Sequence, residues 1–297
     1  MVPNSSSKMK FLRYWAKASA KATAPDGRTL AFACWRGSDR SLDDAQTSAR
    51  MAAEEVAARA AQSGEPTRGY LYGERPIREE VVREIASGDG GPAAVITRNS
   101  FGCLVLNTAR VLFVDVDLPP ARLAASAGGW LARLLGRRGQ GSNDGAEAQA
   151  LERLDAWVRA HPGVGFRAYR TRAGLRYLGT SGVFEPASAA AEALLEALGC
   201  DPLYVRLCRA QRSFRARLTP KPWRCGVVRP PSRFPHESAE REEAFRRWLE
   251  RYEALSVRFA TCAHVSTVGV EGVHGEVEPI LRLHDEATRA ASGRALA

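Results

Sequence analysis

Hydrophobic and polar residues alternate with strand spacing near the amino terminus and then change to helical spacing. Apolar-rich runs at Phe11–Ala20 and Thr29–Arg36 flank the turn sequence Ala24-Pro-Asp-Gly27, which predicts a β-hairpin. The alanine-rich segment Ser41–Ala61 begins with a serine and has acidic residues in its first turn, as is typical of a helix amino terminus. The first part of the chain therefore predicts a hairpin followed by a helix.

A second, shorter helix is expected at Arg78–Ala86. The sequence Ser87-Gly-Asp-Gly-Gly-Pro92 then interrupts regular structure, because glycine and proline punctuate helices and strands. We therefore predict an N-terminal hairpin–helix unit at residues 1–92 and a core at residues 93–265.

Within the core, segments with strand spacing and segments with helical spacing follow one another. The expected strands are Ala94–Arg98, Cys103–Thr108, Val111–Leu118, Phe166–Arg170, Leu175–Gly179 and Ser213–Thr219, and the expected helices are Ala146–Ala160, Ala189–Leu198, one that begins at Asp201-Pro202, and Glu240–Ala254. Residues 121–149 are expected to be a flexible insertion, because Gly136–Gly145 is rich in glycine and polar residues. The tail at 266–297 is compatible with a helix over Glu276–Ala291.

Composition adds an excess of positive charge to this picture. The 297 residues carry 43 Lys and Arg against 33 Asp and Glu, a formal net charge of +10, which favours a polyanionic partner such as nucleic acid or a nucleotide. Nine basic residues and no acid lie between 202 and 236, so the excess is concentrated in one segment. A solvated basic face is the alternative interpretation of that segment.

Other features indicate the compartment. The six cysteines are scattered without CxxC spacing, which fits a reduced cytoplasm better than a disulfide scaffold. Residues 1–24 have no apolar segment typical of a signal peptide, and no run of about 18 apolar residues predicts a membrane span. We therefore expect a cytoplasmic protein with no membrane partner.

The strand Val111–Leu118 carries the most distinctive pattern. Alternation places Asp115 and Asp117 on one face at the end of the strand, and Pro119 closes it. Neighbouring carboxylates repel each other unless a cation joins them, and Mg²⁺ or Mn²⁺ binds such oxygen ligands together with substrate phosphates. The alternative is an edge strand with two solvated aspartates.

Arginines on two further strands supply possible partners for phosphates. The hairpin at 166–179 contains Arg167, Arg170, Arg172 and Arg176 without an acid, and alternation places Arg215 and Arg217 on one face of the strand 213–219. Guanidinium groups suit phosphate oxygens, and Phe214 and Trp223 offer rings on which bases can stack. Aspartates that hold metal and arginines that hold phosphates together indicate phosphoryl or nucleotidyl transfer.

Three short motifs in this order resemble the archaeo-eukaryotic primase superfamily, especially its primase-polymerases. They are Phe113-Val-Asp-Val-Asp117 on an apolar strand, Arg170-Thr-Arg-Ala-Gly-Leu-Arg176 in a hairpin with a turn glycine, and Asp201-Pro-Leu-Tyr204 followed by Arg212-Ser-Phe-Arg215 and Lys221. The resemblance extends over residues 95–225 or so. It implies that Asp115, Asp117 and Asp201 bind divalent metal, and that Arg215 and Lys221 contact the phosphates of an incoming nucleotide.

One position departs from the pattern of that family. Its second motif normally carries a nucleotide-binding histidine, and Arg176 stands in that place. An arginine can still grip a triphosphate, although the loss of the histidine also suits a degenerate, non-catalytic relative. The fold expected from the elements and the resemblance is α+β, with a mixed or antiparallel RRM-like sheet, flanking helices and the N-terminal β-hairpin–helix unit.

The first expectation for function is a metal-dependent nucleotidyltransferase of the primase-polymerase type, using Mg²⁺ or Mn²⁺ and acting on nucleoside triphosphates and nucleic acid in DNA replication or repair. The expected catalytic and metal-binding residues are Asp115, Asp117 and Asp201. The expected substrate-binding residues are Arg170, Arg172, Arg176, Arg212, Arg215, Arg217 and Lys221.

Two alternatives remain open at the level of sequence. The same RRM-like sheet can hold nucleic acid through its arginines without any chemistry. Asp-x-Asp after an apolar strand also resembles the first motif of haloacid-dehalogenase-like phosphatases, although Pro119 stands where their threonine is expected. A zinc site among Cys262, His264, His274 and His284 finds little support, because the spacing matches no standard finger.

Overall fold

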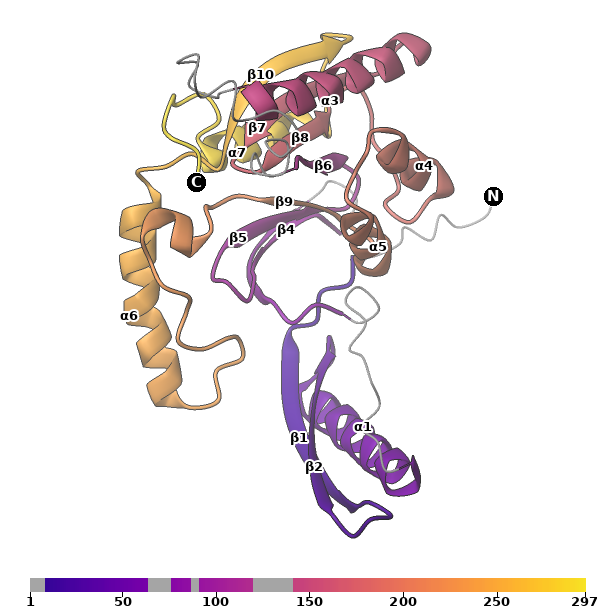
Figure 1. Cartoon of the computed structure of the whole chain (residues 1–297), viewed down its shortest axis with the longest axis vertical. Coiled ribbons are helices and arrows are strands. Elements are labelled where there is room, and N and C mark those ends of the chain that lie inside the picture. The colour runs from indigo at the N-terminus through magenta and orange to yellow at the C-terminus, as the bar shows by residue number, and fades with distance from the viewer. Residues whose placement is uncertain (1–8, 64–75, 87–90, 120–140) are drawn as a thin grey trace, which may run out of the picture.

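The strands of the computed structural model form three sheets within its described residues, which are 9–63, 76–86, 91–119 and 141–297 (Figure 1). The strands are β1 (Tyr14–Thr23), β2 (Thr29–Ser38), β3 (Glu80–Ala86), β4 (Pro92–Arg98), β5 (Leu104–Thr108), β6 (Phe113–Asp117), β7 (Gly165–Thr171), β8 (Gly174–Gly179), β9 (Phe214–Arg217) and β10 (Cys262–Gly269). The helices are α1 (Leu42–Ser63), α3 (Gly141–Ala160), α4 (Ala189–Ala197), α5 (Pro202–Gln211), α6 (Ala239–Ser256) and α7 (Glu278–Thr288), with a short 3₁₀ helix η2 (Pro222–Cys225).

The sheets confirm the predicted α+β class but differ from the single sheet expected. One has the order β10-β7-β8-β6, the second has the order β3-β4-β5-β9, and β1 pairs with β2 alone. All neighbouring strands in these sheets are antiparallel. The core is therefore built from two four-stranded sheets, with β6 and β9 at their edges.

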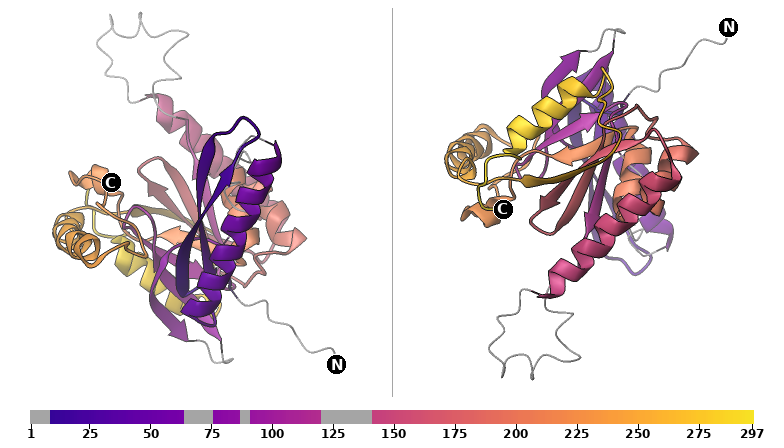
Figure 2. Two further views of the ribbon diagram at one scale, coloured as in Figure 1. Left: turned by 90° about the horizontal axis from the view of Figure 1, so that it is seen from below. Right: turned by 90° about the horizontal axis from the view of Figure 1, so that it is seen from above.

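The predicted N-terminal hairpin and helix are confirmed. Strands β1 and β2 pair from Tyr14 opposite Ser38 to Thr23 opposite Thr29, around the turn at Gly27. Helix α1 lies along this hairpin, where Ala45 and Ala49 pack against Ala16, and small side chains allow that close approach (Figure 2). The unit projects from the two larger sheets (Figure 1).

The prediction of a helix at Arg78–Ala86 is wrong, because this segment forms strand β3. Val81, Val82 and Ile85 are β-branched residues that suit a strand, and β3 pairs with β4 through two register shifts. The boundary predicted at residue 92 thus separates two paired strands. The boundary predicted at residue 265 also falls inside a strand, because β10 pairs with β7. Both strands belong to the core.

Helices α3 and α7 cover opposite faces of the sheet that contains β6. On one face, Trp157 of α3 packs edge-on against Phe166, and the hydroxyl of Tyr177 donates to the carbonyl of Ala150. On the other face, His284 of α7 contacts the rings of Phe113 and Tyr169. The right-hand view of Figure 2 shows the two helices on either side of these strands.

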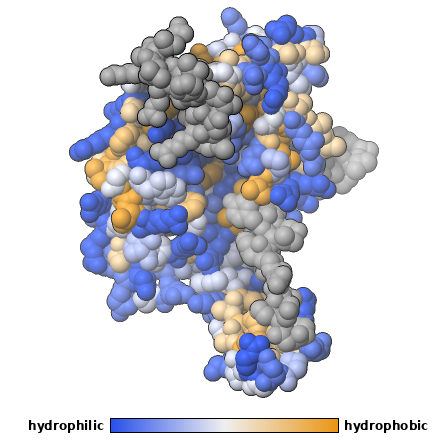
Figure 3. All heavy atoms as spheres, in the orientation of Figure 1, coloured by the Kyte–Doolittle hydropathy of each residue, from blue (hydrophilic) through white to orange (hydrophobic). Residues whose placement is uncertain are grey.

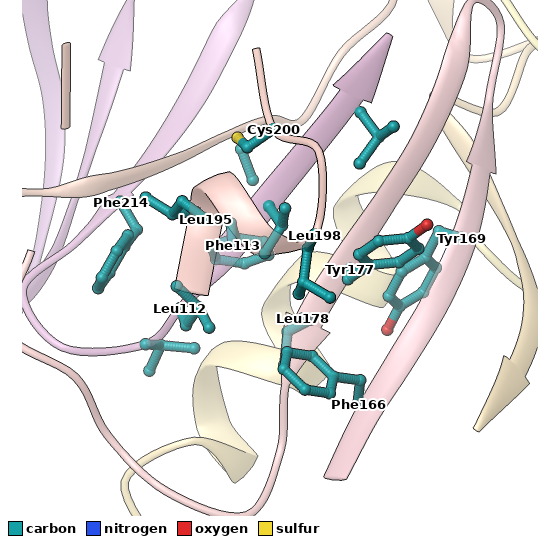
Figure 4. Packing of buried hydrophobic residues seen from close by; sticks show 14 of the residues in the cluster. Leu112, Phe113, Phe166, Tyr169, Tyr177, Leu178, Leu195, Leu198, Cys200 and Phe214 are labelled. Atoms are coloured by element: carbon teal, nitrogen blue, oxygen red, sulfur yellow. The ribbon is translucent and has the colours of Figure 1, made fainter. Parts of the chain in front are cut away.

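Buried apolar residues from both large sheets and from α4 form one continuous core. Phe113 of β6, Tyr177 of β8 and Phe214 of β9 are fully buried there, next to Leu195 of α4 and to Leu198 (Figure 4). Hydrophilic residues predominate on the face seen in Figure 3, while the lobe formed by β1, β2 and α1 exposes apolar residues such as Met51. Residues of β6 and β9 therefore share one apolar core.

The helix predictions in the core are confirmed at their capping residues. The side chain of Ser188 accepts a hydrogen bond from the backbone N–H of Ala191, and that of Asp201 accepts one from Leu203, with Pro202 at the first helical position. The predicted insertion at 121–149 lies outside the described residues as far as 140. From Gly141 onward the expectation of a loop is wrong, because α3 begins there.

The predicted helix in the tail is also confirmed, as α7. No helix in the described parts of the chain combines the length and the apolar character needed to cross a membrane.

Candidate functional site

A cavity of about 380 Å³ opens where the edges of the two large sheets meet the amino terminus of α5. Its walls combine three aspartates with four basic side chains. The charged residues that line it are Asp115, Asp117, Asp201, Arg176, Arg217, Lys221 and Arg224. Six of these seven residues were expected at a functional site from sequence alone, and the fold brings them together from β6, β8, α5, β9 and the η2 region.

The two aspartates of β6 face the cavity because alternation places them on the same side of the strand. Asp115 lies opposite Arg176 in the β6–β8 pairing, and Asp117 lies opposite Gly174. A Cβ atom at Gly174 would approach the carbonyl oxygen of Val116 to 2.0 Å, so only glycine permits this close strand contact. The turn glycine of the hairpin therefore lets β8 reach the acidic end of β6.

Arg176 is a buried cation that joins the two sheets. Its Nε donates to Oδ1 of Asp115 over 2.9 Å, and its Nη2 lies 3.4 Å from Oδ2 of the same carboxylate. Its Nη1 donates to the backbone carbonyl of Arg217 on β9 over 3.0 Å. Burial lowers the pKa of the Arg176 guanidinium, but its neighbours, with Asp115 foremost, together raise the pKa above its ordinary value. Arg176 thus orients Asp115 and ties β8 to β9.

A buried histidine lies directly behind Arg176. Nε2 of His284 is 3.4 Å from Nη1 of Arg176, and its Nδ1 is 3.0 Å from Oδ1 of Asp285. The arrangement fits a neutral ring whose Nδ1–H donates to Asp285 and whose Nε2 accepts from Arg176. Burial lowers the pKa of His284; the hydrogen bond to Asp285 opposes this effect, and the Arg176 guanidinium adds to it. The chain from Asp285 through His284 and Arg176 therefore ends on Asp115.

Three basic side chains on the opposite wall lack carboxylate partners among the described residues. Arg217, Lys221 and Arg224 form no ion pair there, and the buried Nε of Arg217 has no hydrogen-bond partner in the described part of the chain. Burial lowers the pKa of each of the three groups, and the charge of Arg217 lowers those of Lys221 and Arg224 further. This wall carries positive charge that an anion would stabilise.

The wall that carries Asp115, Asp117 and Asp201 has an excess of negative charge. Burial raises the pKa of Asp117, and the carboxylates of Asp115 and Asp201 raise it further, while Lys221 and Arg217 oppose them less strongly. The backbone N–H of Asp201 donates to the carbonyl oxygen of Asp115 over 3.2 Å, which holds the start of α5 against β6. Asp117 and Asp201 form no ion pair within the described residues. Apart from the Asp115–Arg176 pair, the acidic and basic side chains that line this cavity form no ion pair with one another.

The donors suit a hard divalent cation only in part. Carboxylate oxygens are the ligands that Mg²⁺ and Mn²⁺ prefer. Within the described residues, however, no three His, Cys, Asp or Glu side chains form a group able to hold a metal ion. Mg²⁺ is commonly held by one or two carboxylates together with substrate phosphates, and Asp117 and Asp201 fit that mode better than a complete protein cage.

Four of the expected substrate-binding residues do not line this cavity. Arg215 is buried in an ion pair with Glu79, at 2.8 and 2.9 Å from its two carboxylate oxygens, and so turns away from the cavity. Arg170 pairs with Glu147 of α3. Arg172 is exposed and does not line the cavity, although its charge lowers the pKa of Arg224. Arg212 ends α5 in a left-handed conformation.

Sequence reasoning also missed residues that the fold brings to the site. Arg224 was counted in the basic segment but not selected, and its position one turn after Lys221 was the available signal. His284 was considered only as a zinc ligand. Its Nε2 does lie 3.9 Å from Sγ of Cys262, but no third metal ligand joins them in the described chain.

The site is thus defined by its charged walls, by the buried Arg176 and by Asp201 at the start of α5. Comparisons with protein-family models, with curated proteins and with solved structures found no match to this chain.

Proposed function

We propose that the protein is a metal-dependent nucleotidyltransferase of the primase-polymerase type. The observation that carries the proposal is the cavity that Asp117 and Asp201 line together with Arg217, Lys221 and Arg224, with no ion pair formed by these five side chains among the described residues. Side chains of opposite charge that line one cavity can share a ligand that carries both charges. A metal–triphosphate ligand satisfies both walls at once, since the acids take the metal and the basic groups take the phosphates.

The residues of the cavity have separate roles in this proposal. Arg217, Lys221 and Arg224 bind and orient the triphosphate, and their unpaired charge stabilises the negative charge that develops on the phosphates during transfer. Arg176 holds Asp115 in a fixed orientation through its two nitrogens. A bound divalent metal would neutralise phosphate charge and lower the pKa of the attacking hydroxyl.

The topology around β6 supports the RRM-like part of the proposal. Strand β6 is followed by helix α3 and then by β7 and β8, and the three strands are adjacent in the order β7-β8-β6. This β-α-β-β arrangement is the first part of a split βαβ unit. The acidic pair lies on its first strand, as the resemblance to primase-polymerases implies.

The test is nucleotide incorporation by the purified protein. With Mn²⁺, a primed or bare template and labelled nucleotides, we expect product extension that is lost on Asp115→Ala combined with Asp117→Ala. Asp39→Ala removes an exposed carboxylate of the N-terminal unit and serves as the matched control. In parallel, Mn²⁺ with a nucleoside triphosphate is expected to raise the melting temperature of the wild type and of the control, but not of the double variant.

A second function, nucleic-acid binding without chemistry, is favoured by one observation. Both oxygens of Asp115 face Arg176, which leaves this carboxylate less available to a metal. If the wild type and the double variant are equally inert and both bind DNA with a steep salt dependence, the binding function replaces the enzymatic one. Phosphate release from a simple monoester, lost on Asp115→Asn, would instead support a phosphatase.

A further inference from the structure

An exposed aromatic and cationic surface lies beside the cavity. The ring of Trp223 meets that of Phe101 edge-on, with centroids 5.3 Å apart and planes at 84°. The guanidinium of Arg229 lies 5.5 Å from the Trp223 ring and 5.8 Å from that of Phe101, and Nζ of Lys221 lies 5.5 Å from the Trp223 ring. We call Phe101, Trp223, Arg229 and Lys221 the aromatic platform. Trp223 is 43% exposed, so part of its surface is accessible to a ligand.

The platform is continuous with the cavity through its own residues. Lys221 belongs to both, and Arg224, one residue after Trp223, also lines the cavity. In and beside η2, Lys221 and Arg224 line the cavity, whereas Trp223 does not line it and is exposed. A polymer whose phosphates enter the cavity therefore passes Trp223 as it leaves.

A second cavity, of about 620 Å³, extends the same chemistry toward the N-terminal unit. Ser100, the neighbour of Phe101, lines it together with Arg233 from the loop that carries Arg229. Its walls include the indoles of Trp15 and Trp35, and the guanidinium of Arg78 lies 4.1 Å from the Trp35 ring. Three arginines and no acid are among its lining residues in the described chain. Aromatic rings and cations thus recur from the first cavity to the second.

We propose that the aromatic platform binds single-stranded nucleic acid and guides it from the acidic cavity toward the second cavity. The proposal deepens the function proposed above, because it names the polymer that the cavity serves. Bases stack on Trp223 and Phe101, while Lys221 and Arg229 contact the flanking phosphates. Stacking on exposed rings between cations is how proteins hold single strands without reading sequence.

Charge and shape favour this occupant over other polyanions. A duplex keeps its bases stacked inside, so it would use the cations of the platform and leave the rings unused. An acidic peptide would use the arginines but gains little from an edge-on pair of aromatic rings. The segment from 202 to 236 contains no acid, so nothing on it repels the strand's phosphates.

Binding of a fluorescein-labelled dT20 strand, followed by anisotropy in EDTA and fixed salt, tests the proposal. We expect Trp223→Ala to weaken binding about tenfold or more, and Arg229→Ala to weaken it and to reduce the salt dependence. Val228→Ala removes a 78% exposed apolar neighbour of the platform, and Arg246→Ala removes an exposed charge on α6. Both control variants are expected to bind as the wild type does.

The same titrations distinguish the possible failures. Unchanged affinity of Trp223→Ala for dT20 overturns the platform, and so does equally tight, Trp223-dependent binding of duplex DNA or of polyglutamate. Circular dichroism and melting curves of each variant show whether a loss of binding follows from misfolding, and Trp223→Phe, which retains a ring, is expected to recover most of the affinity.

The platform and the enzymatic proposal can fail separately. Because the binding assay contains EDTA, Asp115→Ala with Asp117→Ala is expected to bind dT20 at least as well as the wild type. Trp223-dependent binding by a protein that incorporates no nucleotide supports the platform and refutes the nucleotidyltransferase. Nucleotide incorporation with a template KM that Trp223→Ala leaves unchanged refutes the platform and supports the enzyme.

Discussion

Two buried arginines of this protein pair with carboxylates, and the two pairs differ in what surrounds the acid. Arg215 and Glu79 are both buried, with side chains 8% and 5% exposed. Arg176 is just as buried at 2%, but the side chain of its partner Asp115 is 36% exposed and opens into the charged cavity. The same chemical pair is therefore sealed inside the fold in one place and open to a cavity in the other. The exposure of the acid, and not the presence of the arginine, distinguishes the buried pair from the pair at the proposed site.

Breaking the sealed pair is expected to have the largest effect. Arg215→Met leaves the Glu79 carboxylate buried without its cation, and removal of one partner from a buried pair costs about 3–5 kcal/mol of unfolding free energy. Thr97 still donates a hydrogen bond to Glu79, but it supplies no charge. Urea denaturation measures the loss. A variant as stable as the wild type would show that the buried Glu79 carboxylate does not need Arg215 as its cation.

The double variant Glu79→Leu with Arg215→Met is the control for this first prediction. Replacing both partners removes the unpaired charge, and apolar replacement of buried ion pairs is often neutral. We therefore expect the double variant to recover most of the lost stability.

Breaking the open pair, Arg176 with Asp115, is expected to reduce stability less and to abolish the proposed nucleotide incorporation. In Arg176→Met, Asp115 loses its partner but keeps contact with water, so the expected loss is about 1–3 kcal/mol. The carbonyl of Arg217 also loses its donor. Nucleotide incorporation under saturating substrate, measured below the melting temperature of the variant, is expected to disappear because Asp115 is no longer oriented. A stability loss equal to that of Arg215→Met would contradict the distinction between the two pairs.

The sequence predicted the positions of the acidic side chains better than those of the arginines. Strand alternation sufficed to place Asp115 and Asp117 on one face, because that rule is local. Alternation also put Arg215 and Arg217 on one face, but it could not show that Glu79, 136 residues earlier, covers only Arg215. In the same way, His284 reaches Arg176 across 108 residues of chain. Such long-range contacts depend on how the sheets pack, and the error at β3 shows that even a local helix pattern yields to strand pairing.

The open pair is also expected to respond to pH through His284. Burial lowers the pKa of this histidine in the folded state, so the unfolded chain takes up a proton at a higher pH than the folded protein does. Stability is therefore fully present above about pH 6.5 and falls as the pH decreases toward the folded-state pKa, by at most about 1.4 kcal/mol for each pH unit. Protonation would place an N–H of the ring against the Arg176 guanidinium.

Urea midpoints at pH 7.5 and pH 5.5 test this dependence. We expect His284→Gln to lose less stability between the two pH values than the wild type does. His161→Gln, at an exposed histidine directly after α3, is the control and is expected to follow the wild type. An identical loss in the His284 variant would assign the pH dependence to other groups.

The smallest effect is expected at Asp117, where burial and two neighbouring carboxylates oppose its negative charge. The pKa of this carboxyl is raised by burial and by Asp115 and Asp201, so its ionised form weakens the fold at neutral pH. For a group whose pKa is raised on folding, the stability contribution is present at low pH and is lost as the pH rises through the folded-state pKa.

Asp117→Asn removes the cost of ionising this side chain in the folded state. We expect a gain of less than about 1 kcal/mol in unfolding free energy at pH 7, because the group is largely exposed and screened. The gain should vanish at pH 3 and shrink in high salt, and Asp39→Asn, at an exposed acid outside the cavity, should show none. Greater stability together with lost nucleotide incorporation would mark Asp117 as a residue kept for a ligand, whereas a loss of stability would mean that its carboxylate already has a stabilising partner in the fold.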